Sequence, residues 1–491
     1  MITQNTMFNF FLTVISGALM GLAFDHPVLV WLAWLGFVPA FFARKRTGGL
    51  AAGLKQGFVF GLAFYSASVF WVANISRLSW VGWAGYLAAA ALILYLSLYP
   101  ALFFGLAGFF LRRPLAFLSL PALWVLMEFL QENIWAGWGW TSLGHSQHPF
   151  LYLIQPADLG GARFISFLIV MVNVLILEVF LKKAPVKKIA AMILVPLACC
   201  GYGAWRLNSL KPDSSVKLTI LQANIAEADK SDPSAGLRLL ARLDALVAKS
   251  DQAPLVIFPE AGWPFGFSRD SGRLLLDFAR DLDRDLLVGT VKDEGKSFFN
   301  SALLVDRQGR QRACYRKIKI VPFGEYIPMR RFLGFIPAIN NLGDMSPGKE
   351  ETIFPYAGKR FGVLICFEDT FTLSAARLSA RSDFLINITN DEWFRGEPQA
   401  TQHFGIMSLR AVENRVSIAR SANTGISGWT DFCGRQHKLE LSGRRTYMEG
   451  VWTIELPMRQ GGSFYRRFPW AFTLACALFL LILSPAQIKI K

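Results

Sequence analysis

Three residues with reactive side chains lie at or near the ends of apolar runs in the C-terminal half of the sequence. Cys366 follows Val363-Leu364-Ile365, Glu260 follows a run that begins at Val256, and Lys317 lies in the segment YRKIKIVPFGEY. Short apolar runs of this kind are typical of buried strands. Because ligands collect at the carboxyl ends of strands in α/β sheets, three such ends can bring these side chains together.

A thiol, a carboxylate and an ammonium group at one place could carry out covalent acyl chemistry. The thiolate is the nucleophilic form of cysteine, and a free thiol with a pKa of about 8.5 needs a base or a cation beside it. Glu260 could take the proton of Cys366, and Lys317 could stabilise both the thiolate and the oxyanion formed on attack. The main-chain N–H of Phe367 is a second oxyanion donor. Each residue alone is more often structural, so the expectation rests on the three together.

Cys366 could instead be a core residue, half of a disulfide or a metal ligand. The six cysteines are Cys199, Cys200, Cys314, Cys366, Cys433 and Cys476. No C-x-x-C or Cys/His pattern with zinc-ligand spacing occurs, so we expect no metal and no cofactor. Glu368 and Asp369 directly follow the cysteine, which makes either a possible base by position alone.

The composition indicates a membrane protein that carries a soluble part. Hydrophobic residues make up 53% of the chain and charged residues only 18%, against about 25% in an average globular protein. The formal net charge of +16 comes from residues beside apolar spans, which favours anionic lipid over nucleic acid as a partner. About eight spans are long enough to cross a bilayer, at roughly 7–24, 27–43, 51–73, 81–111, 115–135, 164–181, 189–206 and 468–486.

The positive charges of the short loops predict an orientation for these spans. Basic residues cluster at 44–46, 112–113 and 182–188, whereas the alternate loops carry only Arg77 and Arg163. This alternation places both termini in the cytoplasm and residues 207–467 on the outer side. Glu128, Gln131 and Glu132 lie near the outer end of the fifth span, where we expect them to be solvated. The apolar segment 331–337 has two equally weighted readings: it dips into the bilayer or gates the site, or it packs on the soluble domain.

Residues 207–467 have the pattern of a layered α/β domain. The segments 216–221, 255–258, 286–289 and 384–388 are short and apolar, as strands are. Residues 237–248 and 272–283 have the periodicity of amphipathic helices. Strands that alternate with amphipathic helices favour an α/β fold, although this pattern does not fix the order of the strands.

This segment resembles the carbon–nitrogen hydrolase (nitrilase) superfamily, which has a Glu–Lys–Cys triad in an αββα sandwich. The strings F-P-E, Y-R-K-I-K-I-V-P-F-G-E-Y-I-P and L-I-C-F-E-D match its three motifs in order. With V-P-F-G-E-Y after the lysine and eight spans around it, nearly the whole chain resembles the apolipoprotein N-acyltransferase family. Further matches are Phe299-Asn300-Ser301, residues 390–394, residues 422–425, and W-G-W through G-H-S-Q at 138–147.

The resemblance implies a fold, a reaction and a set of roles. Residues 1–206 would form seven transmembrane helices, 207–467 a periplasmic catalytic domain, and 468–491 an eighth helix with a cytoplasmic tail. The enzyme would take an acyl chain from a phospholipid, hold it as a thioester, and pass it to the α-amine of an S-diacylglyceryl cysteine on a lipoprotein. Cys366 would be the nucleophile, Glu260 the general base and later acid, and Lys317 the oxyanion stabiliser. Three further residues match family positions that support the triad: Glu325, Phe367 and Glu368.

The family likeness also implies a location, and the sequence departs from the family pattern at a few positions. The protein would be a monomer in the inner membrane of a diderm bacterium. Phe367 stands where the family often has tyrosine, which leaves a main-chain role intact. Glu392 and Arg395 stand in a loop that is often Asn-Asp-Ala-Trp-Phe-Gly in the family.

Two other functions share these motifs. A membrane-tethered amidase or nitrilase would use the same triad, but a hydrolase needs one anchor and not eight spans. A transporter or receptor with a ligand-binding nitrilase-like domain would not need Glu260, Lys317 and Cys366 intact. Acyl-enzyme formation from phospholipid, followed by its consumption by a lipopeptide amine, distinguishes the transferase from both.

Overall fold

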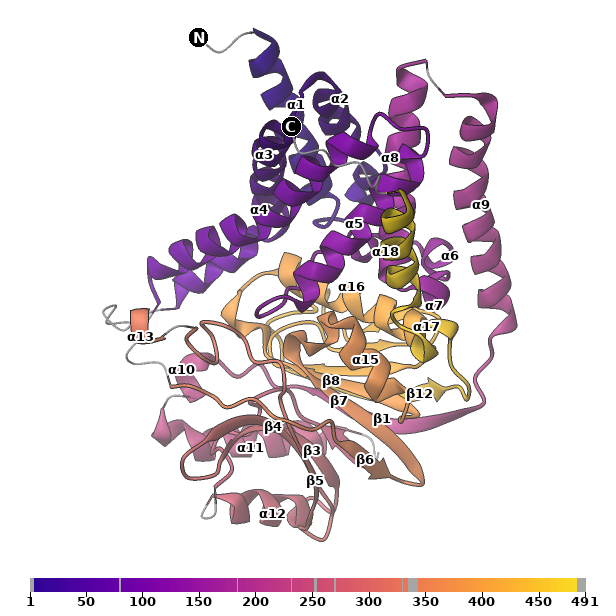
Figure 1. Cartoon of the computed structure of the whole chain (residues 1–491). Helices are drawn as coiled ribbons and strands as arrows, with labels where there is room; N and C mark the ends of the chain where they lie inside the picture. The colour runs from indigo at the N-terminus through magenta and orange to yellow at the C-terminus, as the bar shows by residue number, and fades with distance from the viewer. Residues whose placement is uncertain are drawn as a thin grey trace. The chain divides into compact units, whose positions relative to one another are not determined.

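The computed structural model describes residues 4–78, 81–182, 184–230, 232–250, 254–268, 271–328, 330–333 and 343–483. The chain divides into two compact units (Figure 1). The helical unit comprises Met1–Arg77, Trp83–Leu210 and Ser463–Lys491, and the sheet unit comprises Leu78–Gly82 and Lys211–Gly462. Most of segment 331–337, which was predicted either to reach the bilayer or to pack on the domain, lies outside the described residues.

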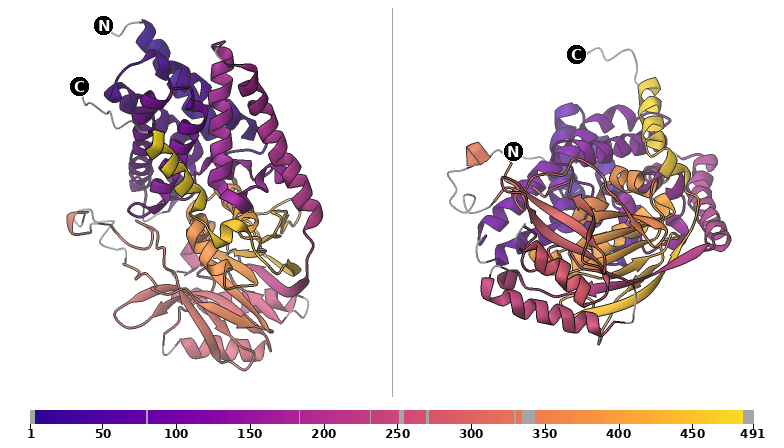
Figure 2. Two further views of the ribbon diagram at one scale, coloured as in Figure 1. Left: turned by 45° about the vertical axis from the view of Figure 1, so that its right-hand side comes forward. Right: turned by 90° about the horizontal axis from the view of Figure 1, so that it is seen from below.

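The helical unit is built from apolar helices joined by short 3₁₀ segments. Helices α8 and α9 form an antiparallel hairpin, drawn in magenta in Figures 1 and 2. The elements of this unit are α1 (Gln4–Leu22), η1 (Leu29–Trp34), α2 (Val38–Arg46), α3 (Leu50–Ser68), η2 (Phe70–Arg77), α4 (Ala84–Phe110), α5 (Ala116–Asn133), η3 (Leu143–Gln147), α6 (Leu151–Ile154), α7 (Ala157–Gly160), α8 (Ala162–Phe180), α9 (Val186–Ser209), α17 (Phe464–Arg467) and α18 (Ala471–Leu483).

The expected count of eight spans is not reached by the helices of the described residues. Among these, four are long and apolar enough to cross a membrane, namely α1, α4, α8 and α9, and a fifth is obtained if α3 and η2, bent by 54° at a break, count as one span. The predicted span 27–43 is not one helix, because the chain forms η1 and α2 there. Helix α18 has only 13 described residues.

The prediction that the polar residues of α5 are solvated is wrong. Glu128, Gln131 and Glu132 are all buried within the helical unit. Glu128 accepts hydrogen bonds from the indole of Trp124, the hydroxyl of Ser142 and the main-chain N–H of Leu143. Buried polar groups need such partners, and here α5 and the following segment supply them to each other. The segment 138–147 is therefore fixed to α5 by its polar side chains, which sequence position alone did not reveal.

The sheet unit contains two six-stranded mixed sheets. The first has the strand order β12-β1-β2-β3-β4-β5 and the second β11-β10-β9-β8-β7-β6. The strands are β1 (Ser214–Gln222), β2 (Leu255–Ile257), β3 (Asp285–Asp293), β4 (Phe298–Val305), β5 (Gln311–Arg316), β6 (Ile353–Tyr356), β7 (Lys359–Ile365), β8 (Phe384–Thr389), β9 (Ile418–Ala422), β10 (Gly428–Thr430), β11 (Gln436–Lys438) and β12 (Gly450–Met458).

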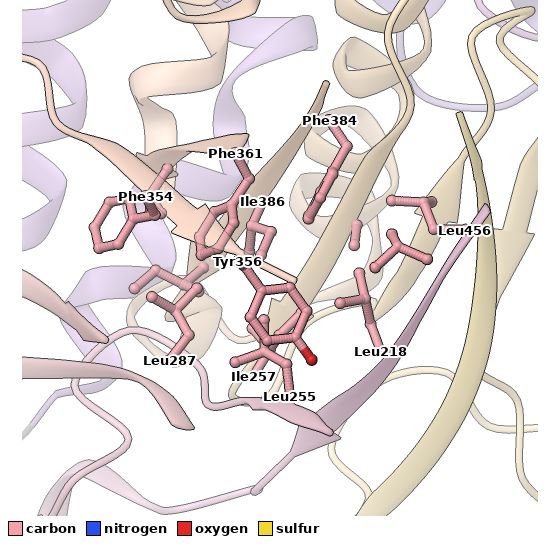
Figure 3. Packing of buried hydrophobic residues seen from close by; sticks show 14 of the residues in the cluster. Leu218, Leu255, Ile257, Leu287, Phe354, Tyr356, Phe361, Phe384, Ile386 and Leu456 are labelled. Carbon is pink, nitrogen blue, oxygen red and sulfur yellow. The ribbon is translucent and has the colours of Figure 1, made fainter. Parts of the chain in front are cut away.

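The two sheets pack face to face around an apolar core. Side chains alternate along each strand, so that one set faces the other sheet and the next set faces the helices. Leu255 and Ile257 of β2 meet Phe361 of β7 and Ile386 of β8 in this core (Figure 3). The intervening Val256 belongs to the cluster beneath the helices instead. Burial on both faces explains why the central strands read as continuous apolar runs.

Helices cover the outer faces of both sheets. Helices α11 (Gly236–Ala248) and α12 (Gly272–Asp281) lie beside the first sheet, and α15 (Thr372–Ser379) and α16 (Glu397–Asn414) beside the second (Figures 1 and 2). Apolar side chains of each helix pair complete a core with the sheet below it. The sheet unit is therefore the αββα sandwich that the family resemblance implied.

The strand directions bring several strand ends together. Strand β3 runs parallel to β2, and β5 is parallel to both because two antiparallel steps separate it from β3. In the second sheet β7, β8 and β9 are parallel. The hydroxyl of Ser421 in β9 donates to the carbonyl oxygen of Ile257 at the end of β2, at 3.1 Å. This edge of the sandwich is where ligands are expected in such sheets.

Candidate active site

Cys366 is the first residue after β7 and begins the short 3₁₀ helix η5 (Cys366–Thr370). Its φ is +54°, a left-handed conformation that a residue with a Cβ adopts at a cost of about 1–3 kcal/mol. The amide of Asn387 donates to the carbonyl oxygen of Cys366 at 3.0 Å and helps to hold the turn. The turn takes the thiol out of the strand, where regular alternation would have placed it with Leu364 on the face that packs against the helices. Strain of this kind is found at functional sites more often than elsewhere.

Glu260 and Lys317 form a direct buried ion pair. Lys317 follows β5 immediately, and its Nζ lies 3.0 Å from Oε1 of Glu260 and 3.0 Å from Oε1 of Glu325. Its side chain is only 1% exposed. The amide of Asn300 in β4 donates to the same oxygens of Glu260 and Glu325, at 2.7 and 2.6 Å. One ammonium and one amide thus hold both carboxylates in place.

The remaining oxygens of the two carboxylates are bound by the main chain. The N–H of Asn390, which follows β8, donates to Oε2 of Glu260 at 2.8 Å, and the N–H of Val321 donates to Oε2 of Glu325 at 2.7 Å. Glu260 is therefore held by both sheets, since Lys317 comes from the first and Asn390 from the second. Hydrogen bonds on both oxygens fix the orientation of this carboxylate, as a group that accepts a proton from a neighbouring thiol would require.

The charges of this cluster shift the pKa values of Lys317 and Cys366. Burial acts to lower the pKa of Lys317, but the carboxylates of Glu260 and Glu325 outweigh it and raise this pKa well above its usual range. Lys317 is thus a permanent cation. Burial of the thiol, together with repulsion from Glu260, raises the pKa of Cys366 well above its usual value, although Lys317 acts in the opposite direction. Cys366 is thus a neutral thiol at rest, and attack requires a base to take its proton.

Glu368 stabilises the turn that carries Cys366. Its Oε2 accepts from the N–H of Ile365 at 2.8 Å, and its Oε1 accepts from the N–H groups of Ile318 and Lys319 at 2.8 and 2.9 Å. The hydroxyl of Tyr315 also donates to Glu368, at 2.8 Å to Oε1. This carboxylate therefore ties η5 to the segment after Lys317. The N–H of Phe367 lies in the first turn of η5, where helical N–H groups have no intrahelical acceptor, so it is available as an oxyanion donor.

Asp369, a possible base only by its position next to the cysteine, belongs to a buried network on the other side of η5. One of its oxygens accepts from Arg420 of β9, and the other lies 3.0 Å from Nε2 of His403 in α16. The second ring nitrogen of His403 lies 3.3 Å from Oδ1 of Asp391. Asp391 opens η6 (Asp391–Trp393), directly after Asn390, whose N–H binds Glu260. The network links the turn of the cysteine to the loop whose main chain binds Glu260.

We predict that His403 makes the stability of the sheet unit depend on pH. Burial and Arg420 act to lower the pKa of His403, but the carboxylates of Asp369 and Asp391 raise it above the ordinary value of 6.5. The folded state then holds this proton more tightly than the unfolded state. The stabilisation is fully present below pH 6.5 and is lost as the pH rises through the raised pKa. The difference in melting temperature between wild type and His403→Gln should therefore shrink as the pH rises above 6.5.

His437 supplies a matched control for this prediction. It stacks on Trp429 at the edge of the second sheet, and burial lowers its pKa. The sign is then reversed, because the folded state releases the proton more readily and is destabilised as the pH falls. The difference in melting temperature between wild type and His437→Gln should be small and should grow with pH. A difference for His403→Gln that stays constant over this range would contradict the prediction.

The structure brings together the six residues proposed from the sequence. Glu260, Lys317 and Glu325 form one cluster, and the charges of Glu260 and Lys317 act on the thiol of Cys366. Glu368 binds the main chain of the segment that follows Lys317. Phe367 is present through its ring, whose centroid lies 5.8 Å from Nζ of Lys317. Sequence reasoning gave no role to Asn300, although it had noted the string that contains it. The signal that could have found it is an amide inside an otherwise apolar strand, where a buried polar group requires a partner.

Together these groups can support acyl transfer to and from a thiol. One edge of the sandwich, where the strand ends meet, holds a neutral thiol, an oriented carboxylate and a permanent cation. The carboxylate can accept the thiol proton, and the cation can stabilise an oxyanion that forms on a nearby carbonyl. The functional groups of this site are therefore one thiol, the carboxylates around it and one ammonium group.

Comparison with known proteins identifies both parts of the chain. The family model of the apolipoprotein N-acyltransferase N-terminal domain matches residues 16–175, and that of the carbon–nitrogen hydrolases matches residues 217–447. Among solved structures, an amidase from Nesterenkonia sp. is similar to 51% of this chain and 93% of its own, with 19% identity and a TM-score of 0.39.

The chain also aligns with relatives over most of its own length and of theirs. The chain is 34% identical to an apolipoprotein N-acyltransferase of Geobacter metallireducens over 98% of this chain and 96% of the relative. It is 30% identical to one of Allorhizobium ampelinum, over 89% and 85%. The chain therefore belongs to the apolipoprotein N-acyltransferase family and is an acyltransferase whose sheet unit is a carbon–nitrogen hydrolase domain.

Proposed function

We propose that this protein transfers an acyl chain from a phospholipid to the α-amino group of the S-diacylglyceryl cysteine at the N-terminus of apolipoproteins. The observation that carries the proposal is the buried Glu260–Lys317 ion pair beside Cys366, in a chain that aligns with apolipoprotein N-acyltransferases over nearly its whole length. Transfer proceeds through a thioester on Cys366, so that the donor leaves before the acceptor reacts.

The first half of the reaction forms the thioester. Sγ of Cys366 attacks the ester carbonyl carbon of the phospholipid while Glu260 takes the thiol proton. Lys317 and the N–H of Phe367 stabilise the oxyanion of the tetrahedral intermediate. The carbon–oxygen bond then breaks, and Glu260 returns the proton to the departing alkoxide of the lysophospholipid. A neutral thiol at rest fits this order, since the proton is removed only on attack.

The second half transfers the acyl chain to nitrogen. The neutral α-amine of the acceptor attacks the thioester carbonyl, and Glu260 accepts a proton from the nitrogen. The carbon–sulfur bond breaks, an amide forms, and the proton restores the thiol of Cys366. Glu325 and Glu368 act as positioning residues, the former on Lys317 and the latter on the turn of Cys366. A site that admits an amine must exclude water, because hydrolysis of the thioester would waste the acyl chain.

Lipid substrates account for the helical unit. A donor and an acceptor that both carry acyl chains reach the enzyme from the membrane, and apolar helices place the catalytic unit there. In this proposal residues 1–206 contain the first transmembrane helices, 207–467 form a periplasmic catalytic domain, and 468–491 form the last helix. The enzyme acts as a monomer in the inner membrane with both termini in the cytoplasm, as the loop charges predict.

Mass spectrometry of the purified protein tests the proposal. After incubation with phosphatidylethanolamine in detergent micelles, the peptide that contains Cys366 should gain the mass of one acyl chain through a bond that hydroxylamine cleaves. Addition of a synthetic S-diacylglyceryl-cysteinyl peptide should remove that mass and produce an N-acylated peptide. If the acyl chain instead appeared only as free fatty acid, the protein would be a hydrolase. If no thioester formed from any donor, the proposed mechanism would be wrong.

A further inference from the structure

Two residues of opposite charge that interact electrostatically in the sheet unit each have a buried polar atom without a hydrogen-bond partner among the described residues. One is Lys230, the last residue of the short helix α10 (Glu227–Lys230), and the other is Glu392 in η6. Both belong to the sheet unit. Neither has a role in the chemistry described above. The sequence had singled out Glu392 only as a departure from the family pattern.

Lys230 is a buried cation without a hydrogen-bond acceptor among the described residues. Its side chain is 12% exposed, and the Nζ atom is buried from solvent. The nearest carboxylate oxygen is that of Glu227 at 3.7 Å, which is an ion pair but is longer than a hydrogen bond. The carboxylates of Glu260 and Glu392 also act electrostatically on this ammonium. A buried ammonium that donates no hydrogen bond is costly, and an acceptor supplied by a ligand would remove that cost.

Glu392 has the complementary property, because it is a buried carboxylate with one oxygen that lacks a hydrogen-bond donor among the described residues. Its side chain is 5% exposed, and Oε1 lies 3.3 Å from Nη2 of Arg395. Oε2 is buried and accepts no hydrogen bond within the described part of the chain. The main chain fixes this residue close to the base, because the N–H of Asn390, two residues earlier, binds Oε2 of Glu260 at 2.8 Å. Glu392 thus offers a hydrogen-bond acceptor next to the carboxylate that takes the proton.

These two buried atoms together define the ligand. A simple anion would be attracted by Lys230 but repelled by Glu260 and Glu392. A simple cation would be attracted by the two carboxylates but repelled by Lys230. A group that carries a donor and an acceptor on neighbouring atoms satisfies both residues. The N-terminal residue of a polypeptide is such a group, since its amino nitrogen and its carbonyl oxygen are separated by only two carbon atoms.

We propose that Lys230 and Glu392 form the subsite for the backbone of the acceptor's modified cysteine. Lys230 donates to the carbonyl oxygen of that residue, and Glu392 accepts one hydrogen of its α-amine. Glu260 receives the other hydrogen as the nitrogen attacks the thioester, and the thiolate of Cys366 takes up that proton when the carbon–sulfur bond breaks. The inference rests on the proposed function and adds a basis for choosing a peptide α-amine over other amines of the membrane.

Two matched acceptors test the role of Lys230. The first is an S-diacylglyceryl-cysteinyl peptide, and the second is S-diacylglyceryl-cysteamine, which has the same lipid and amine but lacks the peptide carbonyl group of the cysteine. The acyl-enzyme is formed first from phosphatidylethanolamine in detergent micelles, and its decay is then followed with each acceptor. Lys230→Met should slow the reaction with the peptide by about ten- to a hundredfold, because this is the usual effect of losing a hydrogen bond to a charged group. It should leave the reaction with S-diacylglyceryl-cysteamine unchanged. Lys230→Arg should recover part of the peptide rate.

Two further variants complete the experiment. Glu392→Gln should slow the reaction with both acceptors, because both carry the amine. This variant still tests the proposal if Lys230→Met does not fold. Lys296→Met, at an exposed turn between β3 and β4, is the matched control and should change nothing. Formation of the thioester should be unaffected in every variant. Slower thioester formation in Lys230→Met would assign the residue to the phospholipid headgroup and overturn the proposal.

Equal slowing of both acceptors by Lys230→Met, or no slowing of either, would also overturn it. These outcomes differ from failure of the proposed function itself, in which the wild-type protein would form no thioester from phospholipid at all.

Discussion

Replacement of Cys366 by alanine is expected to abolish acyl transfer while leaving the protein folded. The thiol is the only group at this strand edge placed to form a covalent acyl intermediate among the described residues, and alanine cannot form one. Loss of a nucleophile of this kind lowers turnover by about 10⁴-fold or more. N-acylation of an S-diacylglyceryl-cysteinyl peptide measures the activity, and thermal melting in detergent measures the fold. We expect the melting temperature to stay close to that of the wild type or to rise slightly, because burial of a polar thiol is lost.

Two companion variants make the result specific to this thiol. Cys366→Ser should be nearly as inactive, because an alcohol is far less acidic than a thiol and Glu260 must remove its proton. Cys314→Ala changes a cysteine of the same unit, in β5, that has no place in the mechanism and should retain full activity. Undiminished turnover in Cys366→Ala would exclude the thioester mechanism altogether.

Replacement of Lys317 by methionine is expected to remove both activity and part of the stability. Loss of one oxyanion donor lowers the rate by about 10²–10³-fold. The variant also leaves the carboxylates of Glu260 and Glu325 buried without the cation that lies 3.0 Å from each of them. Breaking a buried ion pair by removing one partner costs about 3–5 kcal/mol. Thioester formation from phosphatidylethanolamine and chemical unfolding report the two effects separately.

A double variant separates these two consequences of the lysine. Lys317→Met combined with Glu325→Gln removes one of the unpaired charges, so it should regain part of the stability and none of the activity. Lys319→Met is the matched control, because Lys319 lies on the same segment and its ammonium faces the ring of Phe371 at 4.9 Å. It should keep both properties. Full activity in Lys317→Met would show that the oxyanion is stabilised elsewhere.

The sequence allowed the strands and helices of the sheet unit to be predicted in outline. The apolar runs at 216–221, 255–258 and 384–388 are strands β1, β2 and β8, and the periodic segment 237–248 is helix α11. These elements are predictable because burial on both faces of a central strand requires an uninterrupted run of apolar side chains. The order of the strands was not predictable, since it depends on contacts between residues far apart in the chain.

The helical unit shows the limits of counting apolar residues. Residues 27–43 are apolar enough to suggest a span, yet they fold as η1 and α2 with a break between them. Glu128 and Glu132 suggested that this helix end is exposed to solvent. Instead, the hydroxyl of Ser142 donates to Glu128, and Arg163 forms a buried ion pair with Glu132. A charge in a helix can be solvated or paired, and only the position of distant side chains decides between these states.

The sequence by itself determined which residues could do chemistry, because a thiol, a carboxylate and a lysine at or near the ends of strand-like runs are identified by type and position alone. The tertiary structure decided how they are paired. By position alone Glu368 and Asp369 are possible bases for Cys366, whereas the strand-end pattern and the family resemblance point to the distant Glu260. The fold gives Glu368 to the main chain of the lysine segment and Asp369 to Arg420, and it places the distant Glu260 against Lys317. The physical reason is that these partners meet only when the ends of β2, β5 and β7 come together at one edge of two packed sheets.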